Sequence, residues 1–322
     1  MRDPERAGDL EVTTLGEALI VLDPVERGPL RHVCAFEKRI GGAELNVAVA
    51  LTRLGHRAAW AGSLGDDEFG HEILNFLRGE GVDVSGVRLD PDAPTGLYFK
   101  ERRALDSLRT HYYRAGSAAS RQRFEELDLD ALLSGEILHL TGITPALSDS
   151  CRDLTERLMA EAAERGVFLS FDANVRWRLF KGRDPEEVLG PLAALADLLF
   201  LSEEEAELLL GGSGQRAARR ALGELRATTI VVHSAAGSFA VGEDDVVERS
   251  AYPVEVVDVV GAGDAFVAGF LSGRLRGWDT GRSLELANAC GACAVTVPGD
   301  VAGMPSEEEA FSLLRGSREK ER

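Results

Sequence analysis

Short apolar runs alternate with helical patterns along almost the whole chain, and this alternation limits the fold more than any other feature. The predicted strands are Val12–Leu15, Ala58–Ala61, Ile137–Leu140, Val167–Phe171, Leu198–Leu201, Thr229–Val232 and Phe239–Val241. The clearest helical patterns cover Ala43–Leu54, Ser150–Arg165 and Ser283–Val297. Strands that alternate with helices form βαβ units, so we expect a layered α/β domain with a mainly parallel central sheet.

Two segments, about residues 18–40 and 95–117, interrupt this alternation. In the second, Gly96-Leu97-Tyr98-Phe99 and Thr110-His111-Tyr112-Tyr113-Arg114 read as two short strands joined by a polar turn. Both segments flank the helix start at Gly41-Gly42 in sequence order. We therefore expect them to form a small antiparallel β lid over one edge of a site.

Composition and charge restrict the partners of the chain. Its 322 residues are 44% hydrophobic and 28% charged, which favours a single domain over residues 1–316 with a charged tail at 317–322. The formal charge of −18 repels nucleic acid and anionic membrane surfaces, so neither is an expected partner.

The N-terminal residues lack the apolar stretch of a signal peptide and no later apolar run reaches membrane-spanning length. We expect a cytoplasmic protein that forms a homo-oligomer.

The cysteines do not indicate a disulfide framework, because there are four of them and they are scattered. Only Cys290 and Cys293 have C-x-x-C spacing, and they lie within a helical pattern rich in small residues. No second pair and no histidine lies nearby in the sequence. We interpret the pair as packing residues and not as a zinc or redox site.

The stretch from Asp258 to Phe270 carries the strongest chemical signal. Small residues at Gly261-Ala262-Gly263 precede an apolar helical pattern, so their backbone N–H groups are expected to converge at a helix N-terminus, where anions bind. Asp264 follows directly and could accept a proton from a hydroxyl while these N–H groups hold a transferring phosphoryl group. The alternative is an ordinary glycine turn in which Asp264 caps the helix.

Two other nucleotide-binding folds are disfavoured by the same stretch. A Rossmann G-x-G-x-x-G motif is incomplete, because Phe266 occupies the place of the third glycine. A Walker A loop is absent, because no Gly-Lys pair occurs in the chain.

The stretch resembles the C-terminal signature D-T-x-G-A-G-D of the ribokinase-like (PfkB) carbohydrate kinases. The run from Gly41 to Gly55, which includes Asn46, is similar to the N-terminal signature of that family, and the resemblance extends from about Leu15 to Pro305. It implies a ribokinase-like three-layer α/β/α domain with a small β lid. It also implies the cofactors ATP and Mg²⁺, and it leaves open a dependence on a monovalent cation.

Several segments look like those of 2-keto-3-deoxygluconate kinases, above all Tyr112–Ala118 and Leu140–Ser148. By that resemblance the sugar-acid site would contain Gly42, Asn46, Tyr98, Tyr112, Arg114, Arg176 and Asp264. A guanidinium and phenolic hydroxyls suit a carboxylate-bearing substrate, whereas a neutral hexose needs mostly acceptors. The alternatives are an amphipathic lid surface for the tyrosines and Arg114, and a surface salt bridge for Arg176.

The resemblance also places the nucleotide. The segment from Leu198 to Glu207 is similar to the N-x-x-E region of the family, with Ser202 in place of Asn and Glu205 as the acid that would hold Mg²⁺ through water. A capping box between Ser202 and Glu205 is a compatible alternative. The further implied nucleotide contacts are His233, Ala236, Gly237, Gly261, Gly263, Asn288 and Ala292. The family usually has a K/T-x-G-x-x-G loop near His233, whereas this loop is a residue shorter and has Ala235 where the backbone should approach the nucleotide.

Three functional hypotheses follow from these residues. The first is transfer of a phosphoryl group from MgATP to the primary hydroxyl of 2-keto-3-deoxygluconate, with Asp264 as the base. The second is a kinase of the same family for fructose, ribose or a nucleoside. The third is a non-catalytic sugar or nucleotide sensor, suggested by the altered loop and by Val259-Val260 in place of threonine, although a pure binder gains little from Asp264.

Overall fold

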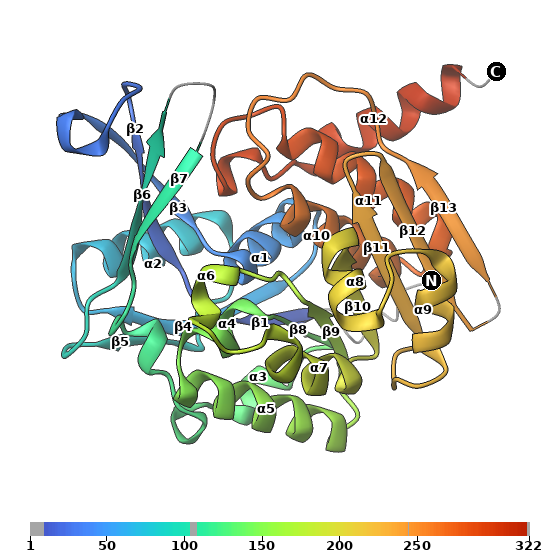
Figure 1. Ribbon diagram of the computed structural model, residues 1–322, viewed down its shortest axis with the longest axis horizontal. Helices are drawn as coiled ribbons and strands as arrows, with labels where there is room; N and C mark the ends of the chain where they lie inside the picture. Colours follow the sequence, from blue (N-terminus) through green and yellow to red (C-terminus); the bar gives the residue numbers. More distant parts are fainter. Residues whose placement is uncertain (1–9, 104–107, 244, 321–322) are drawn as a thin grey trace.

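A central sheet of nine strands organises the computed structural model, which describes residues 10–103, 108–243 and 245–320 (Figure 1). In spatial order the strands are β13 (Val246–Ser250), β12 (Gly237–Gly242), β11 (Thr229–Ser234), β10 (Leu198–Ser202), β9 (Phe168–Asp172), β8 (Ile137–Thr141), β1 (Val12–Leu15), β4 (Ala58–Gly65) and β5 (Val87–Asp90). All pairs from β11 to β5 are parallel, and β12 and β13 add an antiparallel edge. The mainly parallel sheet is confirmed. Every predicted strand is present, and the edge strands β5 and β13 were not predicted.

Helices cover both faces of this sheet, because each central strand buries both of its sides. Along β10, Leu198 and Phe200 belong to one apolar core, whereas Leu199 and Leu201 belong to the other. The first face carries α1 (Ala43–Arg53), α2 (Glu68–Glu80), α10 (Ala262–Leu275), α11 (Thr280–Ala294) and α12 (Glu307–Lys320). The second carries α5 (Asp149–Glu164), α7 (Pro185–Leu195), α8 (Glu203–Leu210) and α9 (Gln215–Leu222). The predicted three-layer α/β/α arrangement is confirmed.

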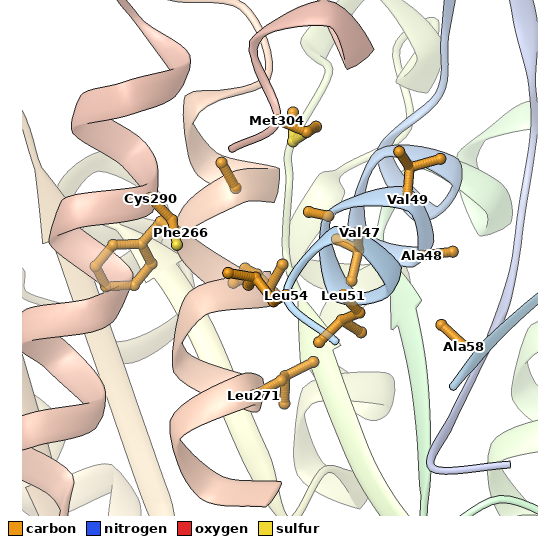
Figure 2. Close-up of a cluster of buried hydrophobic side chains, with 14 of the residues drawn as sticks. Val47, Ala48, Val49, Leu51, Leu54, Ala58, Phe266, Leu271, Cys290 and Met304 are labelled. Carbon is orange, nitrogen blue, oxygen red and sulfur yellow. The ribbon is translucent and has the colours of Figure 1, made fainter. Parts of the chain in front are cut away.

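Small residues let α10 and α11 pack closely. Figure 2 shows the side chains of Cys290 and Phe266 in the apolar core that these helices share. A Cβ atom added at Gly269 would lie 2.8 Å from the Cα atom of Ala287, so a larger residue would push the two helices apart. Cys290 is buried in this core, and burial raises the pKa of its thiol. Burial also raises the pKa of Cys293 to about 11, so both thiols stay protonated at neutral pH. The packing role predicted for Cys290 is thereby confirmed.

A second sheet forms the lid, at the left of Figure 1, in the order β3 (Phe36–Gly41), β2 (Leu19–Pro24), β6 (Gly96–Arg102) and β7 (Leu108–Tyr113). Its strands come from the two predicted lid segments. The outer pairs are antiparallel, whereas β2 and β6 pair in parallel. Parallel neighbours need a long connection, and here β3, α1, β4, α2 and β5 lie between β2 and β6 in the sequence. The predicted polar turn of the lid includes residues 104–107, which lie outside the described part.

Helix α12 continues through Lys320 and so includes residues 317–320 of the expected charged tail. Residues 321–322, like residues 1–9, lie outside the described ranges. No helix in the described part of the chain combines the length and apolar character that are needed to cross a membrane.

Candidate active site

A cavity of about 700 Å³ lies where the lid, the starts of α1 and α10, and the carboxyl ends of β9, β10 and β11 meet. Ligands of parallel α/β sheets bind at this end of the strands. Most of the predicted site residues line the cavity: Gly42, Asn46, Tyr98, Tyr112, Arg114, Arg176, Ser202, Glu205, His233, Gly261, Gly263 and Asp264. The fold therefore brings together side chains that are up to 222 positions apart in sequence, from Gly42 to Asp264.

Asp264 lies in the first turn of α10 with its carboxylate facing the cavity, and it is 6% exposed. Its Oδ2 atom accepts a hydrogen bond of 2.7 Å from the amide of Asn46, and Oδ1 accepts a longer one of 3.4 Å from Asn174. Burial raises the pKa of Asp264 from 3.8 to about 6, against the opposing effects of Asn46 and of the charge on Arg176. At neutral pH the group is ionised, and it is a stronger base than an ordinary aspartate.

Two glycines bring the helix starts into position. Gly261, which precedes α10, has φ +79°, and a Cβ atom there would lie 2.8 Å from the Cε atom of Met304. Gly42, which precedes α1, has φ +151°, and a Cβ atom there would lie 2.3 Å from the carbonyl oxygen of Glu17. Each turn needs glycine for its backbone angle and for the close contact. As a result, Asn46 in the first turns of α1 reaches Asp264.

The first turn of α10 can bind an anion. N–H groups in this position have no partner within the helix, and the helix dipole favours negative charge beside them. Gly263 lines the cavity and leaves the approach open, since an added Cβ atom there would meet only the Cε1 atom of His233 at 3.7 Å. Burial lowers the pKa of His233, so its ring is neutral at pH 7.

A group of carboxylates faces Asp264 from the end of β9 and the start of α8. Burial raises the pKa of Asp172 well above its ordinary value, and the charges of Glu205 and Asp264 raise it further. Arg176 opposes this effect: its charge lowers the pKa of both Asp172 and Asp264. Arg176 is exposed and its side chain makes no hydrogen bond or ion pair with the residues that the structure describes, so its guanidinium is available to a ligand.

The lid side of the cavity contains an ion pair that the sequence did not suggest. Arg114 is 7% exposed and its Nη2 atom donates to the carboxylate of Glu17, which is 2% exposed. Burial raises the pKa of Glu17, whereas the charge and hydrogen bond of Arg114 lower it. Glu17 Oε1 and Arg114 Nε are buried and have no hydrogen-bond partner within the described residues. The rings of Tyr98 and Tyr112 lie 5.2 Å apart beside this pair.

Ser202 and Glu205 form the capping box at the start of α8. The Ser202 hydroxyl accepts from the Glu205 N–H at 3.2 Å, and Glu205 Oε2 accepts from the Ser202 N–H at 2.8 Å. Within the described ranges no three His, Cys, Asp or Glu side chains are arranged to hold a metal ion. The other carboxylate oxygen, Oε1, accepts from the Val175 N–H at 2.5 Å. Mg²⁺ keeps several waters and needs only one or two carboxylates beside substrate phosphates, so the remaining lone pair on each Glu205 oxygen fits a nucleotide-borne ion that is held through water.

Comparison with known proteins decides the family. A model described as pfkB family carbohydrate kinase matches residues 9–307. The chain belongs to this family. As a PfkB carbohydrate kinase it is a phosphotransferase, and the fold predicted from its two signatures is confirmed.

Individual relatives agree on the family and differ in their sugars. A 2-dehydro-3-deoxygluconokinase of Thermoproteus tenax is 39% identical over 95% of this chain and 94% of the relative. A probable fructokinase-2 of Arabidopsis thaliana is 34% identical, with 94% and 95% covered. A solved structure of a putative ribokinase II from E. coli, in complex with ATP and Mg²⁺, has a TM-score of 0.88 at 26% identity and covers 95% of this chain and 99% of that one.

Five predicted residues of the PfkB kinase do not line the cavity: Ala236, Gly237, Ala262, Asn288 and Ala292. Ala236 lies in the two-residue turn between β11 and β12, and a Cβ atom at Gly237 would lie 2.3 Å from a carbonyl oxygen of β13. Asn288 accepts from the Ser238 hydroxyl at 3.0 Å and donates to two carbonyl groups of β13, so it fastens α11 to this edge. The anion-stabilising role of Ala262 and the nucleotide contacts of the other four residues stay predictions.

Several cavity residues were not predicted to act there: Glu17, Lys100, Asp172, Asn174 and Asp300. Glu17 and Asp172 each follow a buried run, which is a signal that could have identified them. Lys100 follows Tyr98 by two positions on β6 and therefore shares its face. Asp300 carries no such signal, because it lies in an irregular segment.

Proposed function

We propose that this PfkB kinase transfers a phosphoryl group from MgATP to the primary hydroxyl of 2-keto-3-deoxygluconate and releases the 6-phospho sugar acid. The observation that carries the proposal is a single cavity in which Asp264, the first turn of α10 and the guanidinium groups of Arg114 and Arg176 meet. The names of the T. tenax relative and of the E. coli complex with ATP and Mg²⁺ support the sugar acid and the nucleotide.

Asp264 would act as the general base. Its pKa of about 6 keeps it ionised at neutral pH and lets it accept the proton of the attacking hydroxyl. Asn46 holds one carboxylate oxygen at 2.7 Å, which fixes the other toward the hydroxyl. The new O–P bond forms as the hydroxyl proton passes to Asp264, and ADP leaves with the bridging oxygen.

Charge on the transferred group would be stabilised by the chain's own donors. The N–H groups of Gly261, Ala262 and Gly263 lie at the start of α10, where Gly261 and Gly263 line the cavity. Arg176 adds a guanidinium that has no partner among the described residues and can bind a phosphate. Mg²⁺, when bound, neutralises the nucleotide phosphates, and Glu205 with the Ser202 turn would hold it through water. The lid would exclude water and so limit hydrolysis of ATP.

The sugar acid would lie under the lid against Tyr98, Tyr112 and Arg114. The buried Nε atom of Arg114 has no partner among the described residues and can donate to a substrate carboxylate. A second candidate is a kinase for a neutral sugar such as fructose. It is favoured by the Glu17 pair, which already neutralises Arg114, and by the fructokinase relative.

A screen of ADP release across sugar acids, hexoses, pentoses and nucleosides tests the proposal. We expect kcat/KM for 2-keto-3-deoxygluconate to exceed that for fructose, with product phosphorylated at its primary hydroxyl. A preference for fructose would select the second candidate, and no turnover on any acceptor would refute a kinase function. Organisation of residues 1–316 as a single domain, cytoplasmic location, homo-oligomer formation and a monovalent-cation requirement stay predictions.

A further inference from the structure

Strand β6 of the lid presents a row of polar side chains to the loop that leads into α10. Tyr98, Lys100 and Arg102 occupy alternate positions and therefore share one face of the strand. The Tyr98 hydroxyl lies 3.4 Å from Asp300, and Arg102 makes a bidentate pair with Asp23 at 2.8 and 3.0 Å. Lys100, in the centre of the row, is 1% exposed.

The ammonium group of Lys100 is surrounded by three carboxylates. Its Nζ atom lies 3.3 Å from Asp258, 3.7 Å from Asp300 and 3.9 Å from Asp23. Arg102 supplies the second positive charge, so the group holds three acids and two bases. Among the described residues Lys100 alone contacts all three acids, and its removal would leave the buried Asp300 without an ion-pair partner and Asp23 and Asp258 with Arg102 alone.

Asp258 connects this group to the anion-binding loop. Its Oδ1 atom accepts from the Val260 N–H at 3.2 Å, and its Oδ2 atom accepts from the Gly299 N–H at 3.2 Å. Burial tends to raise the pKa of Asp258, but the charge of Lys100 and these N–H groups lower it overall. Val259, Val260 and Gly261 line the cavity directly after Asp258. The position of the loop therefore depends on Asp258, which Lys100 holds from the lid.

We infer that Lys100 is a positioning residue for phosphoryl transfer: from the lid strand, it holds Asp258 and Asp300 and thereby keeps residues 259–263 in place at the start of α10. The inference rests on the proposed function of this site. A buried ion group is poor evidence for stability, because apolar residues of similar size often stabilise a fold as well or better. In this protein the ion group formed by Lys100, Arg102 and the three acids makes the geometry of the loop depend on docking of the lid. The anion site then reaches its working geometry when β6 covers the cavity.

Lys100→Met tests the inference, because it keeps the length of the side chain and removes its charge. We expect kcat to fall about 10–100-fold, somewhat less than for direct loss of an oxyanion donor, while the Kd of the sugar changes less than about threefold. Lys38→Met is the matched control. Lys38 lies on lid strand β3, is half exposed and pairs with Glu72 away from the cavity, so this variant should keep wild-type kcat and KM.

Chemical rescue separates positioning from general damage to the fold. In Lys100→Ala, ammonium or methylammonium chloride should restore part of kcat with saturation, whereas choline chloride at equal ionic strength should not. If the single variants do not fold, the double variant Lys100→Met/Asp300→Asn takes their place. It removes the positive charge of Lys100 together with the negative charge of Asp300, and it should still show reduced kcat. A kcat within about twofold of wild type in a folded Lys100 variant, or a loss confined to sugar KM, overturns the inference. Wild-type protein that phosphorylates no acceptor would instead refute the proposed function.

Discussion

Replacement of Asp264 by Asn should abolish turnover and leave the fold and sugar binding intact. The change removes the base but keeps the size and planarity of the side chain. Loss of a general base costs about 10²–10⁴-fold in rate, so kcat should fall within or beyond that range. The amide that replaces the carboxylate can still form a hydrogen bond with Asn46. The Oδ1 atom of Asn46 has no hydrogen-bond partner among the described residues, and it can accept from the introduced amide after the side-chain amide of Asn46 rotates.

The same substitution should stabilise the protein at neutral pH. The folded-state pKa of Asp264 is raised from 3.8 to about 6, so the native state holds its proton more tightly than the unfolded chain does. The stability gained from that proton is present below pH 3.8 and is lost as pH rises through 6. At pH 7–8 the ionised group therefore costs about 3 kcal/mol, since each pKa unit corresponds to about 1.36 kcal/mol. Rearranged hydrogen bonds reduce the expected gain to about 1–3 kcal/mol.

Coupled ADP release and thermal unfolding measure the two effects. Asp264→Asn should unfold a few degrees above the wild type at pH 8, and the difference should shrink as the pH falls from 6 toward 4. Calorimetric titration with the sugar should give a Kd close to that of the wild type. A variant with more than about a tenth of wild-type kcat would show that Asp264 is not the base. A lower Tm at pH 8 would show that the carboxylate is stabilised in the fold and that its pKa is not raised.

A pH profile and two further substitutions test the site. The acid limb of the pH profile of kcat/KM should have its midpoint near pH 6, the pKa of Asp264, and a midpoint near 4 would contradict the burial effect. Arg114→Leu should lower kcat/KM for sugar acids by an amount that corresponds to about 1.5–3 kcal/mol, and it should leave kcat/KM for fructose nearly unchanged. ADP release with both acceptors measures these effects, and an equal loss with both would assign Arg114 to the lid or the phosphate. Ala235→Gly should lower the KM for ATP, and an unchanged or raised KM would show that the shorter turn holds the nucleotide in another way.

The sequence predicted the central elements well because local patterns determine them. Buried strands such as β9 and β10 are continuous apolar runs, and a parallel sheet requires such runs on both of its faces. The edge strand β13 was missed because only every second residue is partly buried and charged residues interrupt it. The parallel pair of β2 and β6 was missed for a different reason, since the direction of pairing depends on what lies between the strands.

The candidate site shows the same division between local and distant information. Asp264 and its glycines could be predicted, because one short segment contains both the helix start and the base. The partners of the lid could not: Glu17 and Arg114 are 97 positions apart, and Lys100 and Asp258 are 158 positions apart. No periodic pattern joins such residues. Arg114 was predicted as a binder of a substrate carboxylate, whereas the structure shows that it already shares its charge with Glu17.

The acidic surroundings of the cavity bear on which sugars it can accept. Burial and the charges of Glu205 and Asp264 raise the pKa of Asp172, and burial and Asp300 raise that of Asp264, so the empty cavity disfavours added negative charge. An anionic sugar acid bound under the lid would face Arg114, which is paired with Glu17, and Arg176, whose side chain has no partner among the described residues. A neutral sugar would meet no such obstacle. A sugar acid therefore needs Arg176, a proton on Glu17 or both, and the raised pKa of Glu17 makes that proton easier to supply. For this reason the ratio of kcat/KM for the sugar acid to that for fructose should rise as pH falls, whereas protonation of Asp264 near pH 6 should lower both values alike and leave the ratio unchanged.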